Sequence, residues 1–249
     1  MKRNVIALGL GMALLSGAAQ ADTVLGVYAG ASQWSSGLSG KIGITDTDFS
    51  TLGFDDEKNN VLYVALEHPV PLVPNIMLKQ TDLSTTGNAT LAGDVQFDDI
   101  NFTSGEALMT DFDLTQTDAT FYYEILDNWL NLDLGLTLRQ YKGDLTAMSM
   151  SESETIDLDT LLPMGYVKGQ IDLPLTGFSL KADANVISYS GDSITDFSAA
   201  VAWKASFLVA FDVGVEAGYR RLNLDLDDLG DLETNLTIDG PYVGFTAHF

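Results

Sequence analysis

A strict alternation of leucines with polar residues constrains the fold of this chain more than any other feature. Five leucines occupy every second position from Leu130 to Leu138, and the positions between them carry Asn, Asp, Gly and Thr. A helix would spread these leucines around its circumference, whereas a strand places all of them on one face. The segment is therefore predicted to be a β-strand whose two faces meet different environments.

The same period of two recurs along the chain and predicts an all-β protein. Ten strands are expected, at residues 23–35, 60–68, 75–86, 111–126, 129–143, 159–173, 177–189, 196–204, 209–225 and 235–249. The connections between them alternate in length, and the long ones are acidic, at about 36–58, 87–112, 144–158, 190–195 and 226–235. Outer-membrane barrels have this organisation, with short periplasmic turns and longer external loops.

We therefore predict a transmembrane antiparallel up-and-down β-barrel. Ten strands are expected, within a range of eight to twelve. Residues 89–103 alternate weakly and are expected to form a hairpin in the second external loop. If that hairpin crosses the membrane, the strand count becomes twelve.

The N-terminus has the organisation of a secretory signal peptide. Lys2 and Arg3 precede an apolar run, and Ala19-Gln20-Ala21 provides an A-x-A cleavage site, so residues 1–21 are expected to be removed. The remaining domain, residues 22–249, keeps all 35 acidic residues and loses two of the 12 basic ones. We expect export across the inner membrane and residence in the outer membrane of a Gram-negative bacterium.

Composition excludes several classes of function. So acidic a chain would repel nucleic acid, and the absence of cysteine excludes disulfide scaffolds and thiolate sites. The two histidines, His68 and His248, are expected at the periplasmic end, and no G-x-S-x-G turn accompanies them. We therefore predict no catalytic residues, no enzymatic activity and no cofactor.

The basic residues favour a membrane barrel over a water-soluble one. Six of those in the mature domain share the polar phase of the predicted strands with acidic residues, whereas a soluble protein would place most lysines in loops. A closed barrel with this phase turned inward explains the pattern. The predicted lumen charge network comprises Lys79, Asp118, Glu124, Asp133, Arg139, Lys168, Asp172, Lys181, Asp183, Glu216 and Arg220.

Two interpretations of these lumen charges stay open. Pairs such as Lys181–Asp183, Lys168–Asp172 and Arg220–Glu216 lie on the same faces of their strands, and cross-strand partners are equally compatible with the sequence. The favoured interpretation is a salt-bridge plug, because a ten-stranded barrel has little spare width. The other is a selectivity lining for a small polar solute.

Two further sets of residues have predicted roles at the membrane and outside it. Aromatic girdles mark the interfaces of membrane barrels. Trp129, Trp203, Tyr219, Phe245 and Phe249 are predicted for them, with Trp34 as a further candidate. The acidic clusters Asp55–Glu57 and Asp225–Asp231 could bind divalent cations, although solvated loops are the simpler explanation and no metal site is assigned.

Three motifs resemble a small, largely uncharacterised family of proteobacterial outer-membrane β-barrel proteins. They are Glu67-His-Pro-Val-Pro-Leu-Val-Pro-Asn75, Tyr122-Tyr-Glu-Ile-Leu-Asp-Asn-Trp129 and Leu173-Pro-Leu-Thr-Gly177. The C-terminal Phe249, preceded by alternating apolar residues, resembles the signal read by the outer-membrane assembly machinery. The resemblance implies a fold and a location but no activity.

The sequence thus predicts an integral outer-membrane barrel of structural or interaction type, with an ion-paired, largely filled lumen and acidic external loops. Its expected partners are outer-membrane lipids and the assembly machinery, with divalent cations as a further possibility. The alternative is a narrow, porin-like channel for small solutes or ions.

Overall fold

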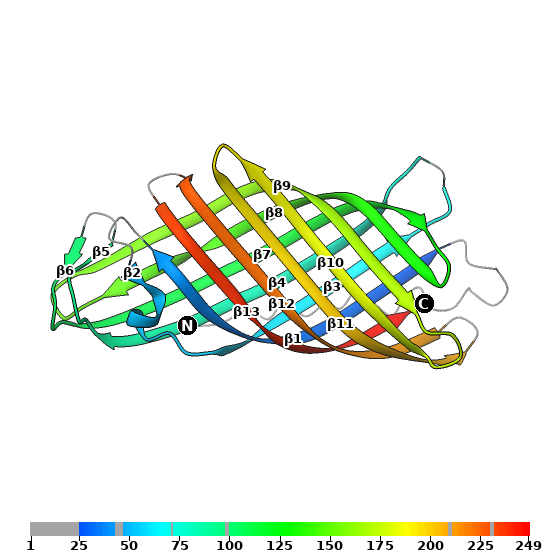
Figure 1. The fold of residues 1–249 in the computed structure, drawn as a ribbon, viewed down its shortest axis with the longest axis horizontal. Helices are drawn as coiled ribbons and strands as arrows, with labels where there is room; N and C mark the ends of the chain where they lie inside the picture. The colour runs from blue at the N-terminus through cyan, green and yellow to red at the C-terminus, as the bar shows by residue number, and fades with distance from the viewer. Residues whose placement is uncertain (1–24, 43–46, 71, 98–99, 209–210, 230–231) are drawn as a thin grey trace, which may run out of the picture.

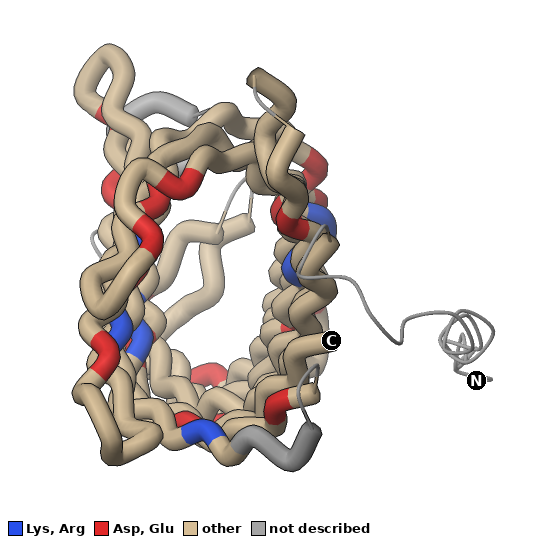
Figure 2. The backbone as a smooth tube through the Cα atoms, turned by 90° about the vertical axis from the view of Figure 1, so that its right-hand side faces the viewer, with Lys and Arg blue, Asp and Glu red and all other residues tan. Residues whose placement is uncertain are grey.

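Ten long antiparallel strands form one closed barrel (Figures 1 and 2). The computed structural model describes residues 25–42, 47–70, 72–97, 100–208, 211–229 and 232–249, so the predicted signal peptide lies outside it. The barrel strands are β1 (Gly26–Ile42), β3 (Glu57–Glu67), β4 (Asn75–Thr90), β7 (Ala107–Leu126), β8 (Leu130–Met148), β9 (Ser153–Asp172), β10 (Phe178–Tyr189), β11 (Asp192–Leu208), β12 (Phe211–Leu229) and β13 (Leu232–His248). Each strand pairs with its neighbour along the chain, and β13 pairs with β1 to close the ring. The predicted ten-stranded barrel is confirmed.

Four small elements lie at one end of the barrel. The strands β5 (Val95–Phe97) and β6 (Ile100–Phe102) form a separate two-stranded sheet, so residues 89–103 add a hairpin and no further barrel strands. The strand β2 (Thr47–Asp48) leads into the 3₁₀ helix η1 (Phe49–Leu52). The amide of Ser50 donates to the Asp48 carboxylate at 2.8 Å, which lowers the pKa of Asp48 below its ordinary value.

We name the two ends of the barrel by what they carry. The hairpin end bears β5 and β6, and the terminal end is where β1 begins, β13 finishes and the short turns lie (Figure 1). Within the described part of the chain, no helix has the length and hydrophobicity of a membrane span.

The strands extend further toward the hairpin end than the sequence predicted. Much of the predicted loops 87–112, 144–158 and 226–235 is barrel wall, and 190–195 holds a tight turn in which Ser190 and Gly191 both have positive φ, 56° and 109°. The acidic residues of these segments alternate with apolar ones, as in Ile156, Asp157 and Leu158. The loop prediction is wrong there because acidic residues that alternate with apolar ones fit a strand with one face in water.

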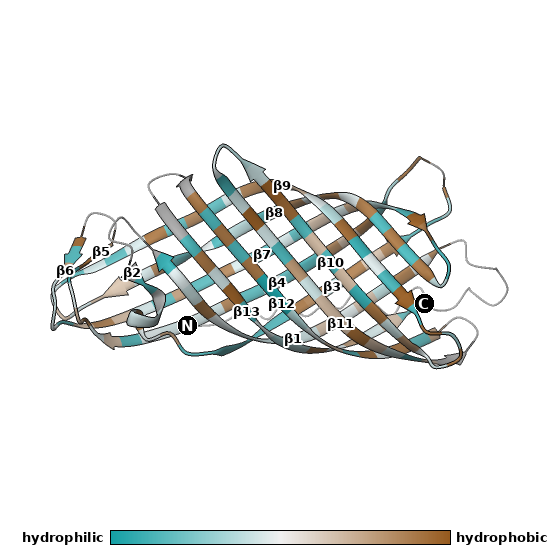
Figure 3. Cartoon of the chain, in the orientation of Figure 1, coloured by the Kyte–Doolittle hydropathy of each residue, from teal (hydrophilic) through white to brown (hydrophobic). Residues whose placement is uncertain are grey.

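The outer surface divides into two zones along the barrel. In the terminal half, outward side chains are apolar, and Leu134, Leu136 and Leu138 on β8 are 44%, 63% and 43% exposed. The same face of β8 continues toward the hairpin end as Gln140 and Lys142. Figure 3 shows the alternation of hydrophobic and hydrophilic residues along the strands. The outer face thus changes from apolar to polar partway along the wall.

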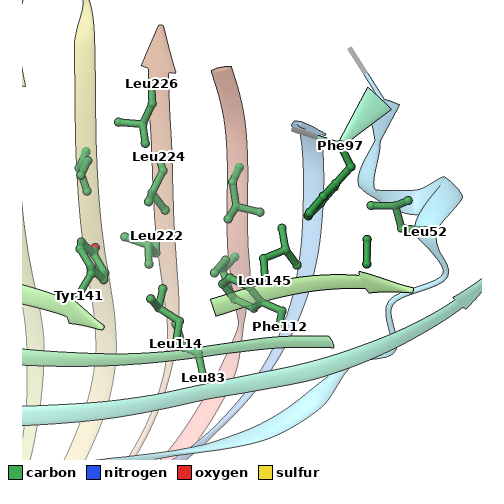
Figure 4. Close-up of a cluster of buried hydrophobic side chains, with 14 of the residues drawn as sticks. Leu52, Leu83, Phe97, Phe112, Leu114, Tyr141, Leu145, Leu222, Leu224 and Leu226 are labelled. Atoms are coloured by element: carbon green, nitrogen blue, oxygen red, sulfur yellow. The ribbon is translucent and has the colours of Figure 1, made fainter. Parts of the chain in front are cut away.

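The interior changes in the opposite direction. In the hairpin half, the inward positions form an apolar core, with Leu83, Leu114, Leu145 and Leu222 all less than a tenth exposed (Figure 4). Phe97 of the hairpin and Leu52 of η1 belong to the same core. The sequence prediction that the apolar face turns outward therefore holds for the terminal half and is wrong for the hairpin half, where the apolar face is enclosed.

Candidate functional site: the charged interior

Four fully buried charged residues form a layer across the middle of the barrel. We call Asp118, Arg139, Asp196 and Arg220 the ionic layer; none is more than 5% exposed. Arg139 on β8 binds Asp118 on β7 through two contacts, Nε to Oδ1 and Nη2 to Oδ2, both 2.8 Å. Its Nη2 also donates to Asp196 Oδ2 on β11 at 2.7 Å.

Arg220 on β12 completes the layer from the other side. Its Nε and Nη2 donate to the two carboxylate oxygens of Asp196, each at 2.8 Å. Its remaining donors reach across the lumen to Thr81 Oγ1 on β4, at 3.0 Å, and Gln116 Oε1 on β7, at 3.3 Å. Bidentate guanidinium–carboxylate contacts are the strong form of the ion pair, and buried charges are tolerated when they are paired in this way.

Trp34 seals the layer on one side. The guanidinium carbon of Arg220 lies 4.6 Å from the centre of the Trp34 ring, and the indole N–H donates to the carbonyl of Gly240 at 3.1 Å. Trp34 is 0% exposed, so its prediction as an interface aromatic is wrong. The parity of β1 turns it into the barrel, where it belongs to the apolar core and also packs against Arg220.

A polar cavity of about 420 Å³ lies on the terminal side of the ionic layer. Residues of the terminal end line its mouth, among them Asp127, Lys204 and His248, and Arg220 and Trp34 line its inner part. Two ion pairs cross its walls: Lys168 Nζ to Asp133 Oδ2 at 2.9 Å and Lys181 Nζ to Glu216 Oε2 at 3.0 Å. Going from the terminal end to the hairpin end, the interior is therefore a polar cavity, a charged layer and an apolar core.

The structure brings together many of the predicted lumen residues, with different partners from those proposed. The same-strand pairs Lys181–Asp183, Lys168–Asp172 and Arg220–Glu216 do not appear among the ion pairs of the described residues. Their bases bind acids on other strands instead. Lys168 lies directly opposite Asp133 on the neighbouring strand β8, where cross-strand side chains are close together. Arg220 binds Asp196 on its neighbour β11, and Lys181 reaches past β11 to Glu216 on β12. The Lys79 ammonium lies 3.9 Å from Asp118 Oδ2, at the edge of the ionic layer.

The remaining predicted lumen acids line the cavity, and the groups that donate hydrogen bonds to them are neutral. Glu124 accepts from the Asn75 amide at 3.2 Å, Asp172 from Gln170 at 2.8 Å, and Asp183 from the Ser198 hydroxyl at 2.6 Å.

Sequence reasoning missed Asp196, the carboxylate shared by both arginines. The sequence does place Asp196 on the inward face of its strand. It is an even number of residues from Ser198 and Lys204, which lie on the polar phase of the same strand. It was overlooked because the predicted strand began at Asp196, whereas β11 begins at Asp192. Its importance comes from contacts with strands far away in the sequence.

The other predicted residues occupy the barrel surface and the terminal end. Exposed aromatic side chains are Trp129, Trp203, Tyr219, Phe245 and Phe249. Trp129 and Phe249 lie at the terminal end of the apolar zone. Tyr219 lies at its other limit, because the next outward residue on β12 is the polar Arg221. Their role as interface girdles stays a prediction.

The histidines and the acidic clusters show no catalytic or metal-binding arrangement among the residues described. His248 stacks on Tyr28, with ring centres 4.1 Å apart, and its Nδ1 lies 3.8 Å from Asp212. His68 Nδ1 accepts from the Val70 amide. No group of three potential ligands is placed to hold a metal ion within those ranges, and the side chains of the Asp227–Asp231 cluster lie outside them.

Comparisons with known proteins give a similarity of fold. No protein-family model and no curated protein matches the chain. The translocator domain of the autotransporter NalP from Neisseria meningitidis is 10% identical, with a TM-score of 0.45 over 91% of this chain and 88% of that one. The outer membrane protease OmpT from Escherichia coli is 10% identical, with a TM-score of 0.41 over 90% and 94%.

A third solved structure is also similar in fold. The transport unit of the autotransporter AIDA-I from Escherichia coli is 11% identical, with a TM-score of 0.40 over 94% of this chain and 92% of that one. Similarities at this level assign no function to the present chain. The family resemblance based on sequence motifs stays a prediction.

Proposed function

We propose that this chain is an integral outer-membrane protein whose terminal half lies in the lipid and whose hairpin half projects from the cell surface. The reversal of hydropathy along the wall supports this arrangement. The terminal half has an apolar exterior and a charged interior, as a membrane barrel does. The hairpin half has a polar exterior and an apolar core, as a water-soluble barrel does.

Strand length supports the same arrangement. The strands β7 and β9 have 20 residues each. A tilted strand crosses the hydrocarbon core with about 9–11 residues, so roughly half of each long strand is left to project beyond the membrane. The short turns and both ends of the barrel would face the periplasm.

We propose further that the barrel is closed to passage and acts as a structural or interaction protein of the envelope. The single observation that carries this is the ionic layer, whose residues reach from β8 to β11 and from β12 to β4 and β7. The packed core lies beyond it, with Leu222 and Ile238 at 0% exposure. The rigid projecting wall, with outward acids such as Asp111 and Asp157, would be the part presented to other molecules.

Conductance of the refolded protein in a planar lipid bilayer tests the closed lumen. The wild type is expected to show no steady current. Neutralising Arg139, Lys168 and Lys181 together would leave buried carboxylates unpaired, and we expect lower stability or cation leakage. Stable conductance in the wild type, with an unchanged unfolding midpoint in the triple variant, would favour the alternative function of a narrow channel.

A further inference from the structure

The cavity at the terminal end has the size and shape of a small-molecule site. Its volume of about 420 Å³ falls within the range of ligand pockets, and it is blind, because Arg220 and Trp34 lie at its inner end. Its mouth opens at the terminal end, where Asp127, Lys204 and His248 line it. A ligand would therefore enter from the solution on that side, independently of any passage through the barrel.

The walls of this cavity carry more acids than bases. Eight carboxylates line it against five basic side chains. Two of those bases are engaged with carboxylates that do not line the cavity: Arg220 with Asp196 and Lys79 with Asp118. The lysines at 168 and 181 each neutralise one wall carboxylate. The cavity therefore holds a surplus of negative charge.

Two of the surplus carboxylates are held side by side by neutral groups. Glu67 Oε1 accepts from the Tyr122 hydroxyl at 2.7 Å, and Glu124 Oε2 accepts from the Asn75 amide at 3.2 Å. Asn75 pairs with Tyr122 across β4 and β7, which fixes the two donors next to each other. Among the described residues, neither carboxylate has a basic group within ion-pair distance, so each keeps unused acceptor capacity toward the cavity.

Tyrosines supply a second, independent feature that points to a ligand. Five line the cavity, and Tyr166 is only 6% exposed. Its ring centre lies 6.0 Å from that of Tyr122, and its hydroxyl makes no hydrogen bond to any residue within the described ranges. Because Tyr166 lines the cavity, its hydroxyl can accept a hydrogen bond from a ligand that donates one. Aromatic faces attract cations as well.

We propose that this cavity binds a small organic cation with primary ammonium groups, of the diamine or polyamine class. One ammonium would lie between Glu67 and Glu124, where its N–H groups can donate to both carboxylates. The alkyl chain would lie along the rings of Tyr122 and Tyr166. A metal ion fits less well, since no group of three ligands converges among the residues described. The proposal goes beyond a closed structural barrel and does not depend on it.

Calorimetric titration of spermidine into the folded mature protein in a non-ionic detergent tests the proposal. We expect saturable binding of one spermidine per chain. The double variant Glu67→Gln/Glu124→Gln should lower the affinity tenfold or more, because both charge-assisted hydrogen bonds are lost. The matched control is Asp157→Asn/Asp159→Asn, which removes the same charge from the exposed outer wall and should change the affinity less than twofold.

Several outcomes would overturn the proposal. They are absence of saturable binding, an equal loss of affinity in both double variants, and displacement of spermidine by equimolar Mg²⁺, which would indicate a diffuse cation atmosphere. If Glu67→Gln/Glu124→Gln does not fold, Tyr166→Phe decides: a several-fold loss of affinity supports the site, and unchanged affinity contradicts it. None of these results bears on the conductance experiment, so the two proposals fail separately.

Discussion

Asp196 is the most informative single position to perturb, because two buried arginines share it. Its carboxylate accepts from Arg139 at 2.7 Å and from Arg220 through two contacts of 2.8 Å. The substitution Asp196→Asn keeps the shape of the side chain and removes its charge. Arg139 would retain Asp118 as a bidentate partner, so the effect would fall mainly on Arg220.

The expected loss of stability depends on the contacts that Arg220 would keep in the variant. Its other contacts are neutral: the Thr81 hydroxyl, the Gln116 amide oxygen and the face of Trp34. Leaving a buried charge unpaired costs about 3–5 kcal/mol. The ring and the two neutral acceptors offset part of this, since a desolvated cation–π contact contributes about 2 kcal/mol or more. We therefore expect Asp196→Asn to lower the free energy of unfolding by about 3 kcal/mol.

Urea-dependent folding into lipid vesicles measures this change. The folded fraction can be read from the altered mobility of the unboiled protein in a detergent gel. The control is Asp159→Asn, an exposed outer-wall acid that accepts from Gln140 at 3.2 Å and should matter by less than about 1 kcal/mol. A loss below about 1 kcal/mol for Asp196→Asn, or losses of equal size in both variants, would refute the view that the ionic layer is dry and fully paired.

Two further predictions concern the wall itself. Leu134→Lys puts a charge in the apolar zone and should lower the free energy of unfolding by roughly 2–4 kcal/mol, whereas Gln140→Lys on the same face of β8 should lower it by less than about 1 kcal/mol. Equal losses in vesicle refolding would mean that the membrane boundary is misplaced. Gly135→Ala should severely impair folding, because a Cβ there would overlap the carbonyl oxygen of Phe121 on the neighbouring strand. Refolding yields of Gly135→Ala equal to those of the wild type would show that β7 and β8 can separate without loss.

The sequence was sufficient for the fold class because the period of two is a local signal. The alternation of β8 identifies both a strand and its two faces, and the ten strands follow from the same rule. The hairpin end was harder to predict. There the leucines at 222 and 224 keep the same period, but the apolar face points into the barrel and the polar face points outward. Periodicity alone does not say which of the two faces is enclosed.

The sequence predicts most of the charged residues that line the lumen, but not which of them form ion pairs with each other. Parity places Arg139 and Lys168 inside the barrel, because each lies on the polar phase of its strand. The partner of each depends on the register between neighbouring strands, which places Asp118 opposite Arg139 and Asp133 opposite Lys168. The same limit explains Trp34: its ring type suggested the membrane interface, whereas its contact with Arg220 arises only when β1 and β12 are placed in one barrel.

The exchange of faces along the wall also bears on how strands find their correct alignment during assembly. A slip of one residue turns every side chain of a strand to the opposite side. In β8 the slip would turn Asp133 toward hydrocarbon, and in the hairpin half of β12 it would turn Leu222 and Leu224 toward water. Because each long strand runs through both zones, a misaligned strand is penalised at both of its ends at once. A register error is therefore unfavourable both in the lipid-facing zone and in the water-facing zone. A mispaired intermediate has no segment in which the wrong register is tolerated.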